Sequence, residues 1–170
     1  MLDRVREALF STLAPWLEQA FVLDLFAGSG SLGLEALSRG ARGARFVERG
    51  ARAYACLKEN VRQLELSASS SIVRADALSS ASWGDEPADI VFLDPPYELL
   101  DELETRRAVF GALDELARSH LAPEGVVVFH APKRVISPGE FAPGLVFRER
   151  IYGSNALWYV QVDPDKKGTE

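Results

Sequence analysis

The chain has 170 residues, 47% of them hydrophobic and 26% charged, which is the balance of one globular domain with a full core. No apolar run approaches the roughly 20 residues of a membrane span, and the mixed charges of the first residues disfavour a signal peptide. A single cysteine excludes an internal disulfide, and with only two distant histidines beside it a zinc site is disfavoured. The net charge of −6 argues mildly against a general nucleic-acid-binding protein but allows a local basic patch. We therefore expect a cytoplasmic, monomeric protein with no metal site and no membrane contact.

Along the chain, helical spacing of apolar residues alternates with short apolar runs. The expected helices cover 2–19, 31–39, 51–65 and 101–120, and the expected strands cover 21–25, 44–48, 72–76, 89–93, 126–130, about 145–152 and 156–162. In the third helix we expect Ala55, Leu57, Val61 and Leu64 to contact the core and Cys56 to be buried. Helices between strands predict an α/β, Rossmann-like fold, with a mostly parallel sheet covered on both faces and an antiparallel last strand. We expect one domain over 1–163 and a disordered tail over 164–170.

Acids and glycines follow four of the expected strands. They lie in the stretch from Asp24 to Gly30, at Glu48, at Asp76, and in the stretch from Asp94 to Tyr97. Each of them alone suits a turn or a helix cap. Because ligands of such sheets bind beyond the carboxyl ends of the strands, the four positions together predict one site.

The first of these stretches is a glycine loop. Gly28, Gly30 and Gly33 form a G-x-G-x-x-G pattern between a strand and a helix, and Glu48 follows Gly28 at the spacing of a ribose-binding acid. A dinucleotide site of a NAD-dependent oxidoreductase is therefore one interpretation. Asp24 favours another, because a carboxylate beside the loop repels a pyrophosphate and attracts the ammonium and sulfonium of S-adenosylmethionine.

We therefore favour S-adenosylmethionine as the cofactor. In this interpretation the glycines allow the methionine part and the ribose to approach the backbone, Glu48 accepts hydrogen bonds from the ribose hydroxyls, and Asp76 accepts one from the adenine amino group, with Ala77 behind it. The expected cofactor-binding residues are Asp24, Phe26, Ala27, Gly28, Ser29, Gly30, Glu48, Asp76 and Ala77.

The stretch D-P-P-Y, from Asp94 to Tyr97, suits methylation of an exocyclic amine on a nucleobase. Such an amine is a poor nucleophile, and two acceptors aimed at its N–H groups, the Asp94 carboxylate and the Pro95 carbonyl, increase its reactivity. Pro95 and Pro96 hold both acceptors still, and Tyr97 offers a ring on which an extruded base can stack. The sequence therefore predicts Asp94, Pro95, Pro96 and Tyr97 as catalytic residues.

Several stretches resemble the RsmD family, bacterial methyltransferases that modify N2 of one guanine in 16S ribosomal RNA. They are D-R-V-R-E-A-L-F (3–10), L-D-L-F-A-G-S-G-S-L-G-L-E-A-L-S-R-G-A (23–41), F-V-E (46–48) and F-L-D-P-P-Y (92–97). The resemblance implies the seven-stranded class I methyltransferase fold and, as the substrate, 16S rRNA in the small ribosomal subunit or its assembly intermediate. It also suggests that Arg4 and Arg6 lie at the mouth of the active site, where they meet cofactor carboxylate or RNA phosphate.

The sequence departs from this family in one respect. Members usually carry a basic, glycine-containing segment before D-R-V-R-E, whereas this sequence begins almost at that motif. Because that segment is thought to hold RNA, the departure bears on substrate binding and leaves the cofactor residues in place.

An adenine-N6 methyltransferase of DNA or RNA remains the alternative, because D-P-P-Y suits that chemistry too. A cofactor-binding scaffold without catalysis is disfavoured by the intact D-P-P-Y. We expect a structural role for His130, at the end of the fifth strand. A scattered, solvated arrangement is expected for five basic residues, Arg39, Arg42, Arg45, Lys133 and Arg134.

Overall fold

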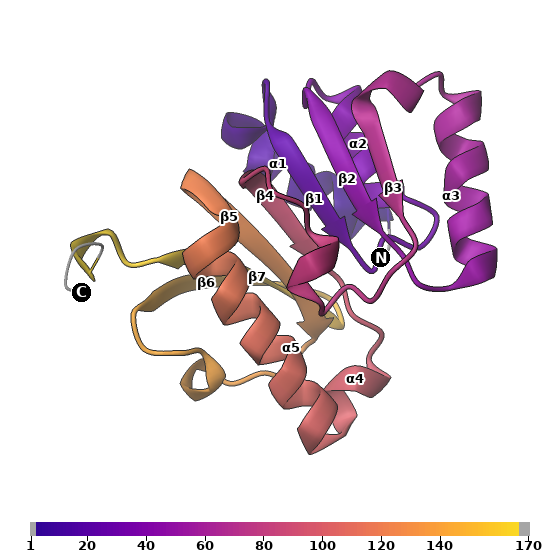
Figure 1. The fold of residues 1–170 in the computed structure, drawn as a ribbon. Coiled ribbons are helices and arrows are strands. Elements are labelled where there is room, and N and C mark those ends of the chain that lie inside the picture. Colours follow the sequence, from indigo (N-terminus) through magenta and orange to yellow (C-terminus); the bar gives the residue numbers. More distant parts are fainter. Residues whose placement is uncertain (1–2, 167–170) are drawn as a thin grey trace.

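A computed structural model describes residues 3–166 and contains a seven-stranded sheet (Figure 1). The strand order is β3-β2-β1-β4-β5-β7-β6, and every neighbouring pair is parallel except those that involve β7. The strands are β1 (Phe21–Leu25), β2 (Gly43–Val47), β3 (Ser70–Val73), β4 (Ala88–Leu93), β5 (Leu121–Pro132), β6 (Leu145–Tyr152) and β7 (Asn155–Val162). The α/β fold with an antiparallel last strand is confirmed.

Helices cover both faces of the sheet, and each face has its own apolar core. The helices α1 (Asp3–Leu17), α2 (Ser31–Ser38) and α3 (Ala51–Gln63) pack on one face, and α4 (Glu98–Asp101) and α5 (Leu103–Glu115) pack on the other (Figure 1). Side chains of the central strands alternate between the two cores, so that Val22 faces α1 and Leu23 faces α5. None of the described helices is long and apolar enough to cross a membrane.

Short helical turns complete the chain. They are η1 (Ser67–Ser69), η2 (Ser80–Ser82), the π-helical η3 (Leu116–His120), η4 (Pro138–Glu140) and η5 (Pro164–Lys166). Of the tail expected at 164–170, the first three residues form η5, and residues 167–170 lie outside the described part of the chain.

Three expected boundaries were wrong. The third strand ends at Val73, because its partner β2 ends there, and Asp76 follows in a turn. The fifth strand is longer than 126–130, because β7 pairs with its far end up to Pro132. The helix expected at 101–120 is divided into α5 and η3, with the separate helix α4 before it.

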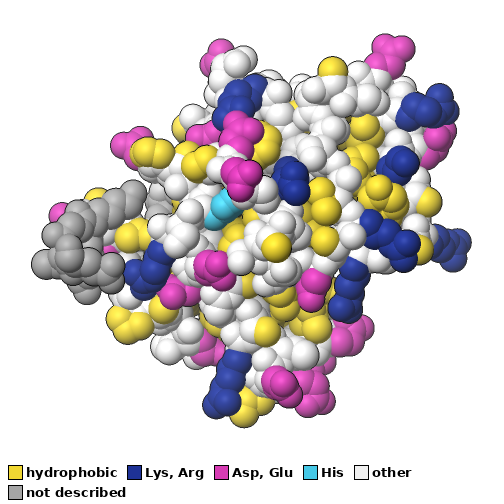
Figure 2. Space-filling model, in the orientation of Figure 1, with side chains coloured by type: hydrophobic (Ala, Val, Ile, Leu, Met, Phe, Trp, Pro, Cys, Tyr) yellow, Lys and Arg dark blue, Asp and Glu magenta, His cyan; other side chains and the backbone are white. Residues whose placement is uncertain are grey.

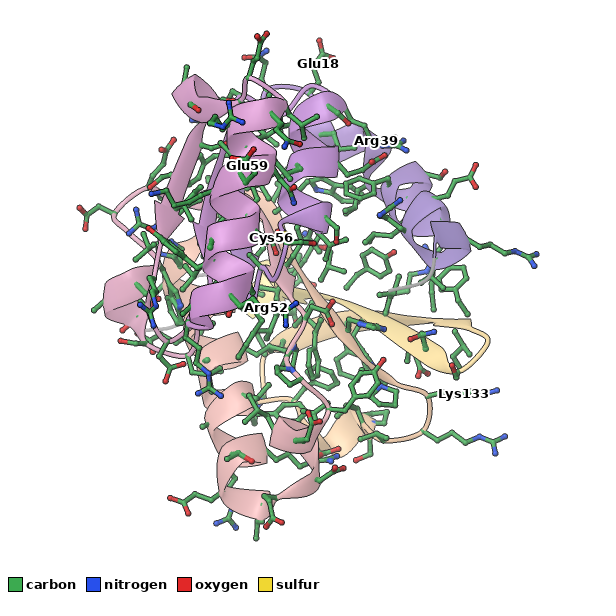
Figure 3. The ribbon with its side chains drawn as sticks, turned by 90° about the vertical axis from the view of Figure 1, so that its right-hand side faces the viewer. Glu18, Arg39, Arg52, Cys56, Glu59 and Lys133 are labelled. Atoms are coloured by element: carbon green, nitrogen blue, oxygen red, sulfur yellow. The ribbon has the colours of Figure 1, made fainter. Side chains whose placement is uncertain are left out.

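The expected inner face of α3 was partly wrong. Leu57 and Val61 are buried, whereas Ala55, Cys56 and Leu64 are exposed. Figure 3 shows Cys56 and Glu59 on the outer side of the helix. Because α3 covers only the margin of the sheet, a narrow apolar stripe is sufficient to anchor it.

Helix α1 runs antiparallel to the parallel strands. The indole N–H of Trp16, near the end of α1, donates to the carbonyl oxygen of Glu124 in the first half of β5 at 3.1 Å. The first turns of α1, with Arg4 and Arg6, therefore lie toward the carboxyl ends of the strands.

Candidate functional site

The glycine loop after β1 has a backbone that turns sharply between the sheet and α2. Phe26, Gly28 and Gly30 all have positive φ angles, of 59°, 58° and 86°. The loop is anchored to two neighbouring elements: the N–H of Ala27 donates to the Val47 carbonyl oxygen in β2, and the Asn60 side chain in α3 donates to the Ser29 carbonyl oxygen at 2.9 Å. Within the loop, the Gly30 N–H donates to the Ala27 carbonyl oxygen. These anchors hold the expected cofactor-binding loop rigidly at the end of β1.

Asp24 lies beneath this loop and is buried. Its Oδ2 accepts a hydrogen bond of 2.8 Å from the Gly33 N–H in α2. In the described part of the chain, the carboxylate forms no ion pair. Burial raises the pKa of Asp24 to about 7, the Gly33 N–H opposes this shift, and the carboxylates of Asp94 and Glu48 add to it. The described residues therefore place a buried carboxylate, without a paired cation, beneath the glycine loop.

Gly33 is required for this close approach of α2 to the sheet. A Cβ on Gly33 would lie 2.3 Å from Cε1 of Phe46 and 3.1 Å from Oδ2 of Asp24. The third glycine of the pattern thus serves helix–sheet packing, and it lets the backbone reach the buried carboxylate.

Glu48 follows β2, and its carboxylate connects the glycine loop to the residue that precedes α3. Its Oε2 accepts from the Gly28 N–H at 2.9 Å and its Oε1 accepts from the Gly50 N–H at 2.5 Å. A carboxylate has about four acceptor sites, so about two remain for a ligand. The two backbone bonds fix the orientation in which those sites face the glycine loop.

Asp76 lies farther from the sheet than expected, because β3 ends three residues earlier. Its carboxylate is exposed, and Oδ1 accepts from the Leu78 N–H at 3.0 Å in a local turn. Ala77 is buried beside it, and its carbonyl oxygen accepts from the Trp83 indole at 2.9 Å. The loop that carries Asp76 is thus ordered by Trp83.

The D-P-P-Y stretch leaves β4 beside the glycine loop. Asp94 is half-buried, Pro95 is buried, and Tyr97 is 44% exposed. Among the described residues, neither Oδ2 of Asp94 nor the carbonyl oxygen of Pro95 accepts a hydrogen bond. Both expected acceptors are therefore available to a ligand, and an exposed ring lies beside them.

Two residues join this site that sequence reasoning had not placed in it. The His130 ring, at the end of β5, lies with Nδ1 2.7 Å from Oδ1 of Asp94 and Nε2 2.8 Å from Oδ1 of Asn155 in β7. The Tyr97 hydroxyl donates to the same Asn155 oxygen at 3.3 Å, and the Tyr97 and His130 rings meet edge to face at 6.0 Å. His130 was expected near the cleft with a structural role, and no sequence signal marked Asn155.

The basic residues named from the sequence do not form one patch. Arg39 pairs with Glu35, and Arg42 pairs with Glu86. Arg45 donates to the Ser82 carbonyl oxygen. Arg4 is exposed on the first turn of α1, and Arg6, two residues farther along that helix, is half-buried and engaged with other groups.

Basic side chains gather instead at the α3 margin of the molecule (Figure 2). Arg52, Lys58 and Arg62 all lie on that helix, and Figure 3 labels Arg52 at one end of it. Arg62 is paired with Glu59 at 2.6 Å. Lys133 extends away from the fold on the other side of the site (Figure 3).

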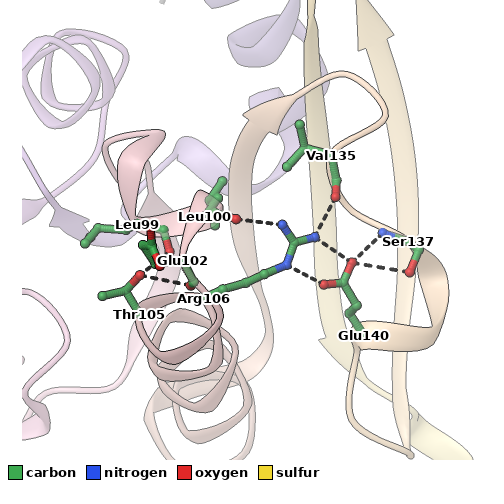
Figure 4. Close-up of polar contacts among 8 residues, drawn as sticks. All are labelled: Leu99, Leu100, Glu102, Thr105, Arg106, Val135, Ser137 and Glu140. Atoms are coloured by element: carbon green, nitrogen blue, oxygen red, sulfur yellow. Dashed lines mark hydrogen bonds and ion pairs between the residues drawn. The ribbon is translucent and has the colours of Figure 1, made fainter.

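A half-buried guanidinium, that of Arg106, secures the loop that follows β5. Arg106 in α5 donates to both Glu140 carboxylate oxygens at 2.6 and 2.9 Å, and to the carbonyl oxygens of Leu100 and Val135 at 2.7 and 2.5 Å (Figure 4). The two carbonyls belong to different segments, α4 and the loop after β5. Arg106 thereby connects the helix that follows D-P-P-Y to the segment that follows His130.

Comparisons with known proteins identify relatives of this architecture. A family model described as "Conserved hypothetical protein 95" matches residues 1–161. A Bacillus subtilis protein named YlbH is 34% identical over 154 residues, which are 89% of this chain and 80% of the relative. "Ribosomal RNA small subunit methyltransferase D" of Escherichia coli is 45% identical over 102 residues, which are 59% of this chain and 51% of the relative, so that match spans about half of the relative's length.

A solved structure shows the same arrangement. The Escherichia coli protein yhhF superimposes with a TM-score of 0.80 at 33% identity, over 96% of this chain and 87% of that chain. The similarity therefore covers both cores, the glycine loop and the D-P-P-Y stretch.

Proposed function

The chain belongs to the family described as conserved hypothetical protein 95, the RsmD family, and from this membership we propose that it transfers a methyl group from S-adenosylmethionine to the N2 amine of a guanine in 16S ribosomal RNA. The proposal extends to the small ribosomal subunit or its assembly intermediate as the substrate, because relatives carry the name ribosomal RNA small subunit methyltransferase D.

One observation carries the proposal. Two unoccupied acceptors, Oδ2 of Asp94 and the Pro95 carbonyl oxygen, lie beside an exposed aromatic ring at the end of β4. The buried carboxylate of Asp24 belongs to the neighbouring strand β1, where Asp24 is in register with Phe92, two residues before Asp94. This arrangement suits a neutral amine that must be held by its N–H groups next to a positively charged donor.

The residues present fit S-adenosylmethionine. The Asp24 carboxylate is buried and without an ion-pair partner in the described chain, so its charge is costly until a cation arrives. Asp24, the glycine loop and Glu48 would hold the cofactor, with Asp76 and Ala77 at the adenine end. When bound, S-adenosylmethionine supplies a methyl group on a sulfonium, which leaves as a neutral thioether.

The side chains of the site prepare the amine. Asp94 Oδ2 and the Pro95 carbonyl accept its two N–H groups and turn its lone pair away from the base ring, toward the methyl group. With the cofactor bound, the amine would take up the methyl group and then lose one proton, which Oδ2 of Asp94 would accept. Tyr97 stacks on the extruded base, and the two prolines keep the acceptors in place at no reorganisation cost during the reaction.

The test is transfer of a tritiated methyl group from S-adenosylmethionine. Small ribosomal subunits lacking the modification, naked 16S RNA and a DNA duplex are offered in parallel, and labelled nucleosides are identified by mass spectrometry. We expect N2-methylguanosine from the ribosomal substrate, and Asp94→Ala is expected to lose transfer while it keeps cofactor affinity. N6-methyladenosine as the product would instead establish the alternative amine, and near-normal turnover of Asp94→Ala would refute the mechanism.

A further inference from the structure

His130 and Asn155 form a connected arrangement with Asp94. We propose that they are positioning residues, which occupy Oδ1 of Asp94 and thereby present its other oxygen, Oδ2, to the target amine. This proposal rests on the proposed function for the identity of the reaction. The contacts that define it, of 2.7 Å and 2.8 Å to the two ring nitrogens of His130, do not depend on that function.

The fold brings the three residues together because they share one face of the sheet. Asp94 lies two residues after Phe92, His130 lies two residues after Val128, and Asn155 lies two residues before Leu157. Phe92, Val128 and Leu157 all belong to the core on the α1 side, and residues two apart on a strand point to the same face. The register places Leu157 opposite His130 in the antiparallel pair. The His130 side chain is 4% exposed, so the ring lies between its two partners out of contact with bulk water.

Both ring nitrogens of His130 face acceptor oxygens, Oδ1 of Asp94 and Oδ1 of Asn155, and this arrangement favours the doubly protonated ring. The groups that face the ring are Asp94 after β4, Tyr97 at the start of α4 and Asn155 in β7. Burial lowers the pKa of His130, but the bonds and charge of Asp94 and the bond to Asn155 outweigh it, so that the net shift is upward.

The consequence for catalysis is geometric. A carboxylate on a single bond can rotate and exchange its oxygens, and the short bond of 2.7 Å between Oδ1 and the buried His130 ring prevents this. Asp94 then offers one defined acceptor, in the same way that Pro95 offers a fixed carbonyl. Asn155 holds the far side of the ring and also receives the Tyr97 hydroxyl, so that the stacking ring and the acceptor keep one spacing.

Kinetics test the proposal first. We expect His130→Ala to lower kcat by about 100-fold, the loss that a misplacement of about 1 Å causes, with the KM for S-adenosylmethionine unchanged within twofold. His130→Gln retains a donor toward Asp94 and should recover part of the rate. His120→Gln is the matched control, because His120 lies in η3 beside Trp83 and outside the site. Unchanged kcat in His130→Ala would overturn the proposal.

An NMR titration of the two histidines separates this proposal from the proposed function and needs no turnover. His130 should titrate above the ordinary histidine range, and His120, whose pKa burial lowers, should titrate below it. Asp94→Asn should lower the pKa of His130 and leave His120 unchanged, whereas Asp76→Asn should move neither. If the protein methylates no RNA but shows this coupling, the arrangement stands and the proposed function fails. An unchanged His130 pKa in Asp94→Asn overturns the arrangement itself.

A separate observation concerns a groove between α1 and the outer strand β6. It has a volume of about 540 Å³ and is lined by Ala8, Ser11, Thr12, Trp16, Arg148, Arg150 and Tyr152. Among residues 3–166, no acid lines this groove, although the chain as a whole carries a net charge of −6. In Figure 3, α1 and the β6–β7 hairpin lie next to each other. We infer that this groove binds the phosphate backbone of the single-stranded RNA that leads into the site.

The arginines of the groove are available for phosphates. Within the described chain, neither Arg148 nor Arg150 forms an ion pair, and the buried Nε of Arg150 has no hydrogen-bond partner. They lie two residues apart on β6, so they repeat along the groove at about 6.8 Å. Tyr152 is next in the same row and pairs in register with Asn155, so the groove ends at the site. Basic side chains together with rings such as Tyr152 and Trp16 suit a single strand.

The test is the salt dependence of binding a fluorescein-labelled single-stranded RNA, measured by anisotropy. We expect Arg148→Gln with Arg150→Gln to reduce the slope of log K against log salt by about 1.4, since each contact to a single strand contributes about 0.7. The control Arg107→Gln removes an exposed charge from α5, on the opposite face of the sheet, and should leave the slope unchanged.

This inference rests on the proposed function for its substrate class, but its readout is binding and not transfer. RNA binding through the two arginines without methyl transfer would support the groove as an RNA-binding site and refute the proposed function. No binding by the unmodified protein at low salt, or a slope that the double variant does not change, would overturn the groove.

Discussion

Asp24→Asn should stabilise the protein without cofactor and at the same time weaken cofactor binding. Asp24 is buried beneath the glycine loop with its pKa raised from 3.8 to about 7. Because the folded state binds this proton more tightly than the unfolded state does, the contribution of Asp24 to stability is greatest below pH 3.8 and is lost as the pH rises to about 7. Asparagine carries no charge, and its oxygen can still accept from the Gly33 N–H.

The size of the effect follows from the shift. The pKa of Asp24 rises from 3.8 to about 7 on folding. At about 1.4 kcal/mol for each pKa unit, this corresponds to a cost of up to about 4 kcal/mol for keeping the unpaired carboxylate ionised in the folded protein. Thermal unfolding of both proteins is measured from pH 4 to pH 8.5. We expect the difference in stability to grow up to about pH 7 and then to level off. In a protein of this size, 1 kcal/mol corresponds to roughly 2–4 °C in Tm, so the difference is easily measured.

Cofactor binding should show the opposite preference. Only the ionised form of Asp24 attracts a cation, and at pH 6 about a tenth of the molecules have that form. The Kd for S-adenosylmethionine, measured by calorimetry, should therefore fall about tenfold between pH 6 and pH 8 in the original protein. Asp24→Asn should bind weakly with no such dependence. Unfolding curves of the two proteins that run parallel over the whole pH range would refute the reasoning.

Three further predictions concern packing and the substrate side. Gly33→Ala should destabilise the fold by about 1–3 kcal/mol in denaturant unfolding, because the added Cβ would lie 2.3 Å from Phe46. Gly111→Ala, in the interior of α5 with no atom near the added Cβ, should instead stabilise the fold by about 0.5–1 kcal/mol. Equal effects of the two substitutions would contradict this reasoning. Arg106→Ala should cost about 1–3 kcal/mol in the same assay, because it leaves the partly exposed Glu140 and two carbonyls without their donor; a loss below about 0.5 kcal/mol would show that the network is dispensable. Tyr97→Phe should keep most RNA affinity and Tyr97→Ala should lose about 1–3 kcal/mol, measured by anisotropy; equal affinities would exclude stacking.

The sequence predicted the parts of the site that lie on one continuous segment. The strand that ends at Leu25, the glycine loop and the D-P-P-Y turn were located because turn chemistry and apolar runs are local signals. Asn155 was not found, because its role depends on the register of β5 with β7, which places His130 opposite Leu157. The apolar run expected at 126–130 placed His130 at the end of the fifth strand, although β5 continues to Pro132, and it gave no signal of the partner of His130.

Errors at the margins of the sheet have a common cause. The third strand was expected at 72–76 from its apolar run, yet its length is set by β2, which gives it partners only up to Val73. Ala55 and Leu64 were expected to contact the core because they are apolar residues of the third helix. Helix α3 lies over the margin of the sheet, however, and only its inner row, Leu57 and Val61, has core residues to pack against. In both places the neighbouring element overrode the local preference of the sequence.

The position of β7 has a consequence for biosynthesis. It is the last of the seven strands to leave the ribosome, yet it lies between β5 and β6 and supplies every described ladder partner of β6. Until it has emerged, β5 presents an open edge and β6 has nothing to pair with, so the nascent chain needs protection from aggregation. Asn155, the first residue of that strand, reaches His130 only at this stage. Completion of the sheet and completion of the candidate site are therefore one and the same event.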